Sequence, residues 1–73
     1  MQVECYSGAR YAERPVALTW QGERLAIEEI ERQWREPGGP AFRVRAAGGQ
    51  RFELHYDERA DAWTGQPLTN PAK

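Results

Sequence analysis

The chain has 73 residues and nearly balanced charge, with 10 Lys or Arg and 11 Asp or Glu. This balance argues against a protein that binds nucleic acid or anionic membranes through its net charge. One cysteine, Cys5, excludes an internal disulfide and a zinc site made of cysteines. The length indicates a single small domain. The sequence carries neither a secretory signal nor a long apolar run, so a cytoplasmic protein is expected.

Near the start of the chain Val3 and Cys5 share one strand parity, which would suit an edge strand in addition to the five strands predicted below. Residues 16–20 alternate between large apolar and smaller side chains, and this period of two predicts a strand with one buried face. Residues 21–24 are predicted to form a tight turn with Gly22 at its first central position.

Residues 26–36 fit two structures. Three large apolar residues lie at helical spacing and indicate a short helix at 28–35: Ile27, Ile30 and Trp34. A strand would instead need one β-bulge near Glu28 and Glu29 to keep these residues on one face. The hairpins predicted on either side favour the bent strand, which is the structure we expect.

The clearest pattern in the sequence is a β-hairpin at 42–56. Apolar residues occupy alternate positions on both predicted strands: Phe42, Val44, Ala46, Phe52, Leu54 and Tyr56. The two apolar faces match when Val44 lies opposite Leu54, because a slip of one residue would place a charged side chain in the core. This register leaves residues 48–50 as the loop, where glycine can adopt positive φ without strain.

The outer face of this hairpin is charged. In the predicted register Arg45 lies opposite Glu53, which is a favourable exposed pair, and Arg43 lies opposite His55. The basic residues of this region form a candidate binding patch for single-stranded nucleic acid or a phosphorylated partner: Arg43, Arg45, Arg51 and His55, together with Arg10, Tyr11 and Arg14.

A polar connection at 57–61 leads to Trp63, which is expected opposite Tyr56 in a final short strand. The chain is therefore predicted to be mainly β, a five-stranded antiparallel meander curled into a small, partly open SH3-like barrel. One domain would cover residues 1–65, and residues 66–73 would form a disordered tail. The large aromatic residues should meet around two aliphatic ones: Trp20, Trp34, Phe42, Phe52 and Trp63 around Val44 and Leu54.

The sequence also carries a string of spaced aromatic, glycine and aliphatic residues: Trp20-x-Gly22, Ile27-x-x-Ile30-x-x-x-Trp34, Phe42-Arg43-Val44, Phe52-x-Leu54-x-Tyr56-Asp57 and Trp63. Over roughly residues 10–65 this string resembles a family of small bacterial domains of unknown function. Some members of that family are attached to proteins related to translesion DNA polymerases. The resemblance implies a small β fold and, by association, a role beside DNA repair, and it brings no catalytic residues.

The sequence presents no spacing that is typical of a catalytic or metal site. His55, the one histidine, is expected to be a solvated residue of the outer face, and Cys5 a small buried or merely incidental one. The carboxylates of residues 28–36 match no calcium loop, and the arginines among them would compete for any cation. We therefore expect no enzyme, no metal and no cofactor.

The expected function is that of a non-enzymatic interaction or accessory module. Its partner would be a protein, either a second copy or another chain, because open sheet edges can pair with a partner strand. The alternative is a single-stranded nucleic-acid-binding module associated with DNA repair. No membrane partner is expected.

Overall fold

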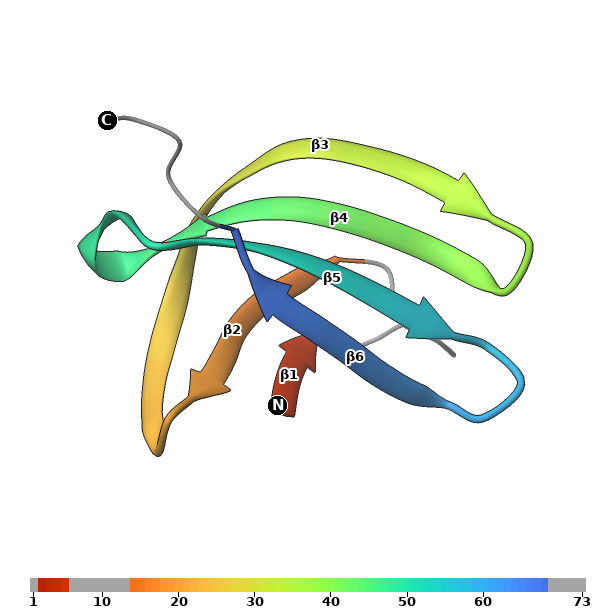
Figure 1. The fold of residues 1–73 in the computed structure, drawn as a ribbon, viewed down its shortest axis with the longest axis horizontal. Coiled ribbons are helices and arrows are strands. Elements are labelled where there is room, and N and C mark those ends of the chain that lie inside the picture. The colour runs from red at the N-terminus through yellow and green to blue at the C-terminus, as the bar shows by residue number, and fades with distance from the viewer. Residues whose placement is uncertain (1, 6–13, 69–73) are drawn as a thin grey trace.

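The chain folds as an antiparallel meander of six strands in one sheet, and the strand order follows the sequence (Figure 1). The computed structural model describes residues 2–5 and 14–68. The strands are β1 (Gln2–Cys5), β2 (Pro15–Trp20), β3 (Glu23–Glu36), β4 (Gly39–Ala46), β5 (Arg51–Asp57) and β6 (Ala62–Pro67). The prediction of a mainly β, curled and partly open barrel is confirmed. The edge strand expected near the N-terminus is β1, and it raises the strand count from five to six.

The C-terminal end of the domain lies further along the chain than predicted. Gln66 and Pro67 belong to β6, although the sequence placed them in the tail. Residues 69–73 lie outside the described part of the chain. Within the described part, no helix is long and apolar enough to cross a membrane.

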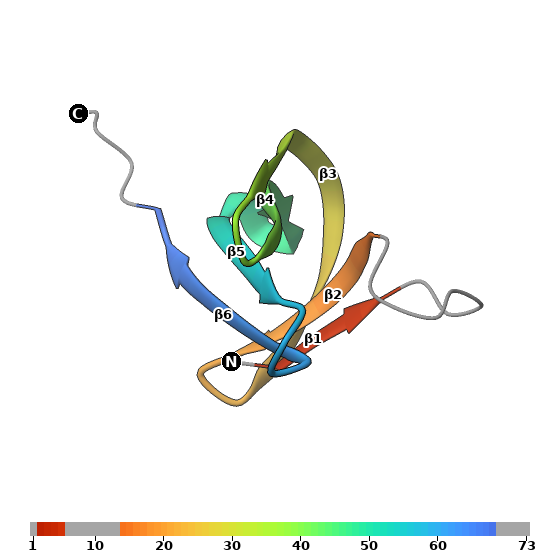
Figure 2. The same cartoon turned by 90° about the vertical axis from the view of Figure 1, so that its right-hand side faces the viewer.

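Strand β3 has 14 residues and bends so that it pairs with two partners in succession (Figures 1 and 2). Its first residues pair with β2, and from Ile27 onward it pairs with β4. The register of the second pairing shifts between Ile27 and Glu29, so the bulge predicted near Glu28 is present. The bent strand is thus confirmed, and the alternative of a short helix at 28–35 is wrong.

A second bulge in β3 decides on which side of the sheet Trp34 lies. The register shifts again between Ile30 and Arg32. Without this shift Ile30 and Trp34 would share one face, because four residues separate them. With it, Trp34 moves to the outer face, opposite Ala41. The prediction that Trp34 joins the core is therefore wrong, and its ring packs edge-on against His55 with the centroids 6.2 Å apart.

The hairpin of β4 and β5 has the predicted faces, but its register differs by two residues. Val44 lies opposite Phe52 and not opposite Leu54. The Ala46 N–H donates to the Gln50 carbonyl at 2.7 Å and closes the loop one residue earlier than predicted. The loop is therefore the short 3-10 turn η1 at 47–49, and its two glycines take positive φ angles of 89° and 87°. Glycine adopts such angles without strain, which explains why the loop ends on this pair.

The turn between β2 and β3 also lies one residue earlier than predicted. Its central residues are Gln21 and Gly22, with φ angles of 52° and 81°. Gly22 thus takes the second central position and not the first. A turn with positive φ at both positions matches the twist of the flanking strands. As a result, Leu18 faces Leu25 across the ladder.

The core lies inside the curl of the sheet. Its fully buried members are Leu18, Phe42, Val44, Ala46, Phe52 and Leu54. The partly buried side chains that pack against them are Val3, Trp20, Leu25, Ile27, Ile30 and Trp63. Trp20 meets Phe52 edge-on at 5.6 Å between ring centroids, and Phe42 lies 5.8 Å from Trp63. The predicted aromatic cluster is therefore present except for Trp34.

The two end strands of the sheet approach each other through side chains. Trp63 of β6 lies opposite Tyr56, as predicted, and its indole lies near enough to the Cys5 thiol of β1 to affect the pKa of that thiol. Figure 2 shows β1 and β6 close together at one end of the barrel. No ladder joins β1 to β6 in the described chain, so side chains close the barrel there and it stays partly open.

Replacing Phe52 should be far more damaging than replacing Arg43. Phe52 is fully buried, and Phe52→Ala should lower the free energy of unfolding by ~3–5 kcal/mol. Arg43 is half-buried on the outer face, and Arg43→Ala should cost under ~1 kcal/mol. Urea denaturation of both variants measures the two losses. A larger loss for Arg43→Ala would show that the faces of the hairpin are assigned incorrectly.

Gly39 should tolerate no side chain. A Cβ atom there would overlap the backbone carbonyl oxygen of Tyr56, and the φ angle of 151° disfavours other residues. Gly39→Ala should therefore cost ~1–3 kcal/mol or more. Gly38→Ala is the matched control, because a Cβ at Gly38 would meet nothing within 4 Å. Thermal and urea unfolding should show a larger loss of stability for Gly39→Ala than for Gly38→Ala. Equal losses would contradict the close approach of β4 to the Tyr56 carbonyl of β5.

Candidate functional site

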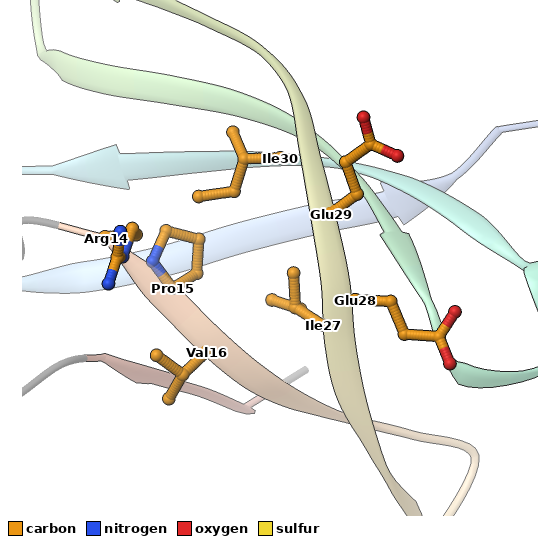
Figure 3. Close-up of a pocket in the computed structure, with 7 residues that line it drawn as sticks. All are labelled: Arg14, Pro15, Val16, Ile27, Glu28, Glu29 and Ile30. Carbon is orange, nitrogen blue, oxygen red and sulfur yellow. The ribbon is translucent and has the colours of Figure 1, made fainter.

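A cleft opens between β2 and β3, at the point where β3 stops pairing with β2 (Figure 3). It has a volume of about 280 Å³ and is lined by Arg14, Pro15, Val16, Ile27, Glu28, Glu29 and Ile30. Ile27 and Ile30 point from β3 toward β2, whereas the side chains of Glu28 and Glu29 point to the other side of β3 (Figure 3). The cleft is therefore lined by both aliphatic and charged residues and lies beside an open strand edge.

The aliphatic residues of the cleft range from exposed to half-buried, and some of them also pack against the core. Val16 is the large apolar side chain that stays exposed in the described chain, at 36%. Leu18, two residues further along β2, is fully buried and pairs with Leu25 of β3. Ile27 and Ile30 are half-buried and also pack against the core.

The sequence pattern placed Val16 on the buried face with Leu18. Val16 is instead exposed while Pro15 and Ala17 on either side of it are buried, because the register of β1 and β2 shifts beside it. The pattern also missed the cleft, because the loss of the neighbouring strand depends on where β3 bends.

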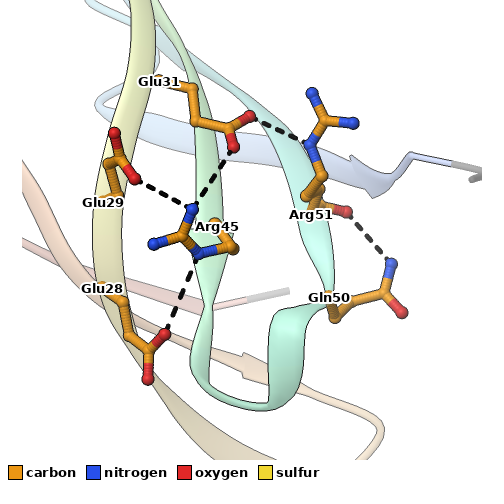
Figure 4. Close-up of polar contacts among 6 residues, drawn as sticks. All are labelled: Glu28, Glu29, Glu31, Arg45, Gln50 and Arg51. Atoms are coloured by element: carbon orange, nitrogen blue, oxygen red, sulfur yellow. Dashed lines mark hydrogen bonds and ion pairs between the residues drawn. The ribbon is translucent and has the colours of Figure 1, made fainter.

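On the other side of β3, carboxylates and arginines form a chain of ion pairs (Figure 4). Arg45 Nη1 lies 2.9 Å from Glu29, and Glu28 and Glu31 lie 3.9 and 3.8 Å from the same guanidinium. Arg51 Nε donates to Glu31 at 2.9 Å. We call these five residues the bulge network. Solvent limits each exposed pair to ~0.2–1 kcal/mol, but the shared carboxylate of Glu31 ties β3 to both β4 and β5.

The bulge network takes two members out of the predicted basic patch. Arg45 was expected opposite Glu53, but in the structure it lies opposite Arg51, and both guanidiniums are held by carboxylates of β3. Arg43 is opposite Glu53 instead. Arg43 is half-buried on the outer face and has no carboxylate partner within the described residues.

The other members of the predicted patch are spread over the chain. Arg14 is exposed, lines the cleft and directly precedes β2. Arg10 and Tyr11 lie outside the described residues. The structure thus brings Arg43, Arg45 and Arg51 together on the outer face and places Arg14 elsewhere.

His55 lies on the outer face of β5 between two carboxylates. Its Nδ1 is 2.8 Å from Glu36 Oε1, and its Nε2 is 3.1 Å from Glu53 Oε2. It sits opposite Ala41 and not opposite Arg43. The expectation of a solvated histidine beside an arginine is therefore wrong. The half-buried ring instead links β3 to β5 across the intervening strand.

Two hydrogen bonds keep the carboxylate of Glu36 ionised. The bond with His55 has the larger effect, and the Trp34 indole N–H donates to the second oxygen at 3.1 Å. Together they lower the pKa of Glu36 from its ordinary value of 4.5. The sequence could not show this arrangement, because it requires Trp34 to face outward.

The remaining titratable groups offer little nucleophilic chemistry. Burial raises the pKa of the Cys5 thiol, and the nearby Trp63 indole opposes this only in part. The Tyr56 hydroxyl donates to Asp61, and this bond raises the pKa of Tyr56 to about 12. Both groups are therefore protonated near neutral pH. Cys5 is a poor nucleophile in this form, because the thiolate is the reactive form of cysteine. In the described chain, no group of three or more potential ligands could hold a metal ion.

Comparisons of the chain with protein-family models, with curated proteins and with solved structures find no match. The resemblance to the small bacterial domain family therefore stays a prediction, as does its association with translesion polymerases. The function has to be inferred from the surfaces of the domain itself.

Acid should remove the contribution of Glu36 to stability. Because the pKa of Glu36 in the folded state lies below 4.5, this group stabilises the fold above that pH and stops doing so as the pH falls through the lowered value. The difference in free energy of unfolding between wild type and Glu36→Gln should therefore shrink below about pH 4.5. Urea denaturation at a series of pH values measures it.

A second variant provides the control for this pH dependence. In a His55→Asn background the main hydrogen bond to Glu36 is gone. The effect of Glu36→Gln should therefore depend less on pH there. A difference that grows in acid would contradict the lowered pKa.

Proposed function

We propose that this domain is a non-enzymatic protein-interaction module that binds an extended apolar segment of a partner protein in the cleft between β2 and β3. One observation carries the proposal: an open strand edge coincides there with exposed apolar surface. The edge is that of β3 beyond Ile27, and the surface includes Val16 at 36% exposure and the half-buried Ile30. A partner strand that added to this edge would cover both.

The backbone of β3 supplies the first part of the binding. From Ile27 to Glu36 this strand pairs with β4 on one side, and no described strand pairs with its other side. Unpaired N–H and C=O groups on a sheet edge can form a ladder with an added strand. Such hydrogen bonds provide affinity for any extended chain, so specificity has to come from side-chain pockets.

The cleft supplies the side-chain specificity. An added strand directs alternate side chains to the same side of the sheet. Apolar residues of the partner would thus reach Val16 and Ile27 at every second position. Each apolar side chain buried in this way contributes up to ~1.5–3 kcal/mol before the costs of association.

The rest of the open edge is protected against unspecific pairing. Bulges and charged side chains are the usual means by which natural sheets prevent edge-to-edge association. The edge of β3 has both, since two bulges interrupt it and most of its residues after Ile30 are charged. A binding segment must therefore match the short apolar stretch at the cleft.

The edge of β6 is less suited to strand addition. The Leu68 N–H donates to the Arg51 carbonyl at 2.8 Å. Because residues of an antiparallel strand alternate in the direction of their hydrogen bonds, Pro67 and Gly65 present their backbone away from β5. Pro67 has no N–H and would interrupt an added strand.

We place this function above the alternative, a single-stranded nucleic-acid-binding module. A nucleic acid would have to compete with Glu29 and Glu31 for Arg45 and Arg51. The alternative predicts an affinity for an oligothymidine that falls steeply with added salt. Fluorescence anisotropy at low ionic strength measures this directly.

Val16→Asp should abolish binding at the cleft and leave the fold intact, because the side chain is exposed. Peptides selected from a random library on the wild-type protein should carry alternating apolar residues. Their affinity for Val16→Asp should fall by at least about tenfold. Thr64→Asp is the matched control, because Thr64 is an exposed strand residue on the outer face of β6. Isothermal titration of the selected peptides with all three proteins measures the effect.

Hydrogen exchange shows whether a strand is added. A bound peptide should protect the β3 amides that face the open edge beside the cleft, near Ile27 to Ile30. Peptides that bind Val16→Asp as tightly as wild type, or that protect amides of β5 and β6 alone, would contradict the proposal. Light scattering adds one distinction: a dimer that Val16→Asp dissociates would identify the partner as a second copy of the chain.

A further inference from the structure

Two arginines on the outer face lack the carboxylate partners that other arginines of the described chain have. The paired ones are Arg24, Arg35, Arg45 and Arg51. Arg32 and Arg43 form no ion pair within the described residues. They also lie directly opposite each other on β3 and β4. Like charges at such positions, with Cβ atoms about 4.5–5.5 Å apart, destabilise a sheet.

The neighbouring carboxylates are engaged elsewhere. Glu53 lies opposite Arg43 on β5, but it is bonded to His55. Glu31 precedes Arg32 in the chain and belongs to the bulge network. The Nε of Arg43 is buried and has no hydrogen-bond partner. The fold thus leaves two positive charges together and one buried donor unsatisfied, which are both unfavourable in the free domain.

We propose that Arg32 and Arg43 bind a phosphate monoester group. A carboxylate carries one charge, and its two oxygens can be satisfied by a single guanidinium. A phosphate monoester carries a charge of about −1.5 to −2 at neutral pH and three acceptor oxygens. It can therefore accept hydrogen bonds from both guanidiniums at once and neutralise both. This site is separate from the cleft, and the inference does not depend on the proposed strand addition.

Trp34 holds one of the two guanidiniums in place. The Arg32 guanidinium carbon lies 5.4 Å from the centre of the Trp34 ring, on the outer face. The indole is in turn fixed by its hydrogen bond to Glu36 and by the edge-on contact with His55. A guanidinium positioned in advance loses less entropy when it binds an anion.

The surrounding charges favour a compact anion over a polyanionic strand. Glu53 and Glu31 flank the arginine pair, and Glu36 lies beyond Trp34 on the same face. A nucleic-acid strand carries a charge at every phosphate and would meet these carboxylates on leaving the pair. A single phosphate group contacts only the two guanidiniums.

The test uses the side-chain N–H signals of the full chain in ¹⁵N-correlated NMR spectra. Inorganic phosphate and phenyl phosphate are titrated at constant ionic strength against chloride, at a pH of about 7.5, above the second phosphate pKa. Both should shift the Arg43 Nε–H and Trp34 Nε1–H signals to saturation. Arg32→Gln and Arg43→Gln should each weaken binding by at least about tenfold. Arg45→Gln is the matched control from the bulge network and should bind as wild type does.

Four outcomes would overturn the proposal. Phosphate could fail to produce saturable shifts, or acetate could produce the same shifts at the same concentrations. Arg45→Gln could weaken binding as much as Arg43→Gln, which would indicate a general charge effect. An oligothymidine could bind the pair more tightly than phenyl phosphate and identify a nucleic-acid site instead. Backbone amide spectra confirm that each variant is folded, and Arg32→Gln, at an exposed position, keeps the test valid if Arg43→Gln unfolds.

Discussion

The bend of β3 is the constraint on which the rest of the structure depends. A straight strand of 14 residues would span about 46 Å at ~3.3 Å per residue. This is longer than the molecule, whose longest dimension is 38 Å. The strand therefore has to turn, and it does so at two bulges, between Ile27 and Glu29 and between Ile30 and Arg32. Because of the turn, β3 can pair with β2 at one end and with β4 at the other, and the sheet curls around Phe42 and the rest of the core.

The same bend produces the two surfaces to which we assign functions. On the inner side, β3 moves away from β2 and opens the cleft beside Val16. On the outer side, the first bulge places Glu28 and Glu29 where both reach Arg45. After the second bulge, no carboxylate of β3 faces Arg43, and Arg32 lies there instead. One feature of the backbone therefore determines which arginines are neutralised and which are not.

How far the sequence predicts this structure depends on which feature is considered. The faces of β4 and β5 follow from the period of two between Phe42 and Tyr56, and they are correct. The register is not fixed by that period, because a shift of two residues keeps every side chain on its face. The loop decides the register, and a pair of glycines flanked by alanine and glutamine fits either of two loop positions.

Trp34 shows a second limit of the sequence pattern. The side of the sheet on which it lies depends on a bulge within a continuous charged stretch, where no residue marks the interruption. The position of His55 relative to Glu36 depends on the same bulge, so the sequence pattern does not predict this contact either.

The unfavourable features of this domain are concentrated beside the bulges of β3. A protein of this size has a net stability of ~5–15 kcal/mol, so a buried unsatisfied donor, at ~1–3 kcal/mol, is a substantial cost. Elsewhere in the described chain, the core is filled by apolar side chains, and Arg24 and Arg35 are held in ion pairs. Sequences that follow the rules of stability nearly everywhere tend to break them where the protein binds something. The exposed Val16 and the unpaired Arg43 are two such departures, and they lie on opposite sides of the bent strand. Their position beside the one element that organises the fold is the physical reason to regard them as binding surfaces.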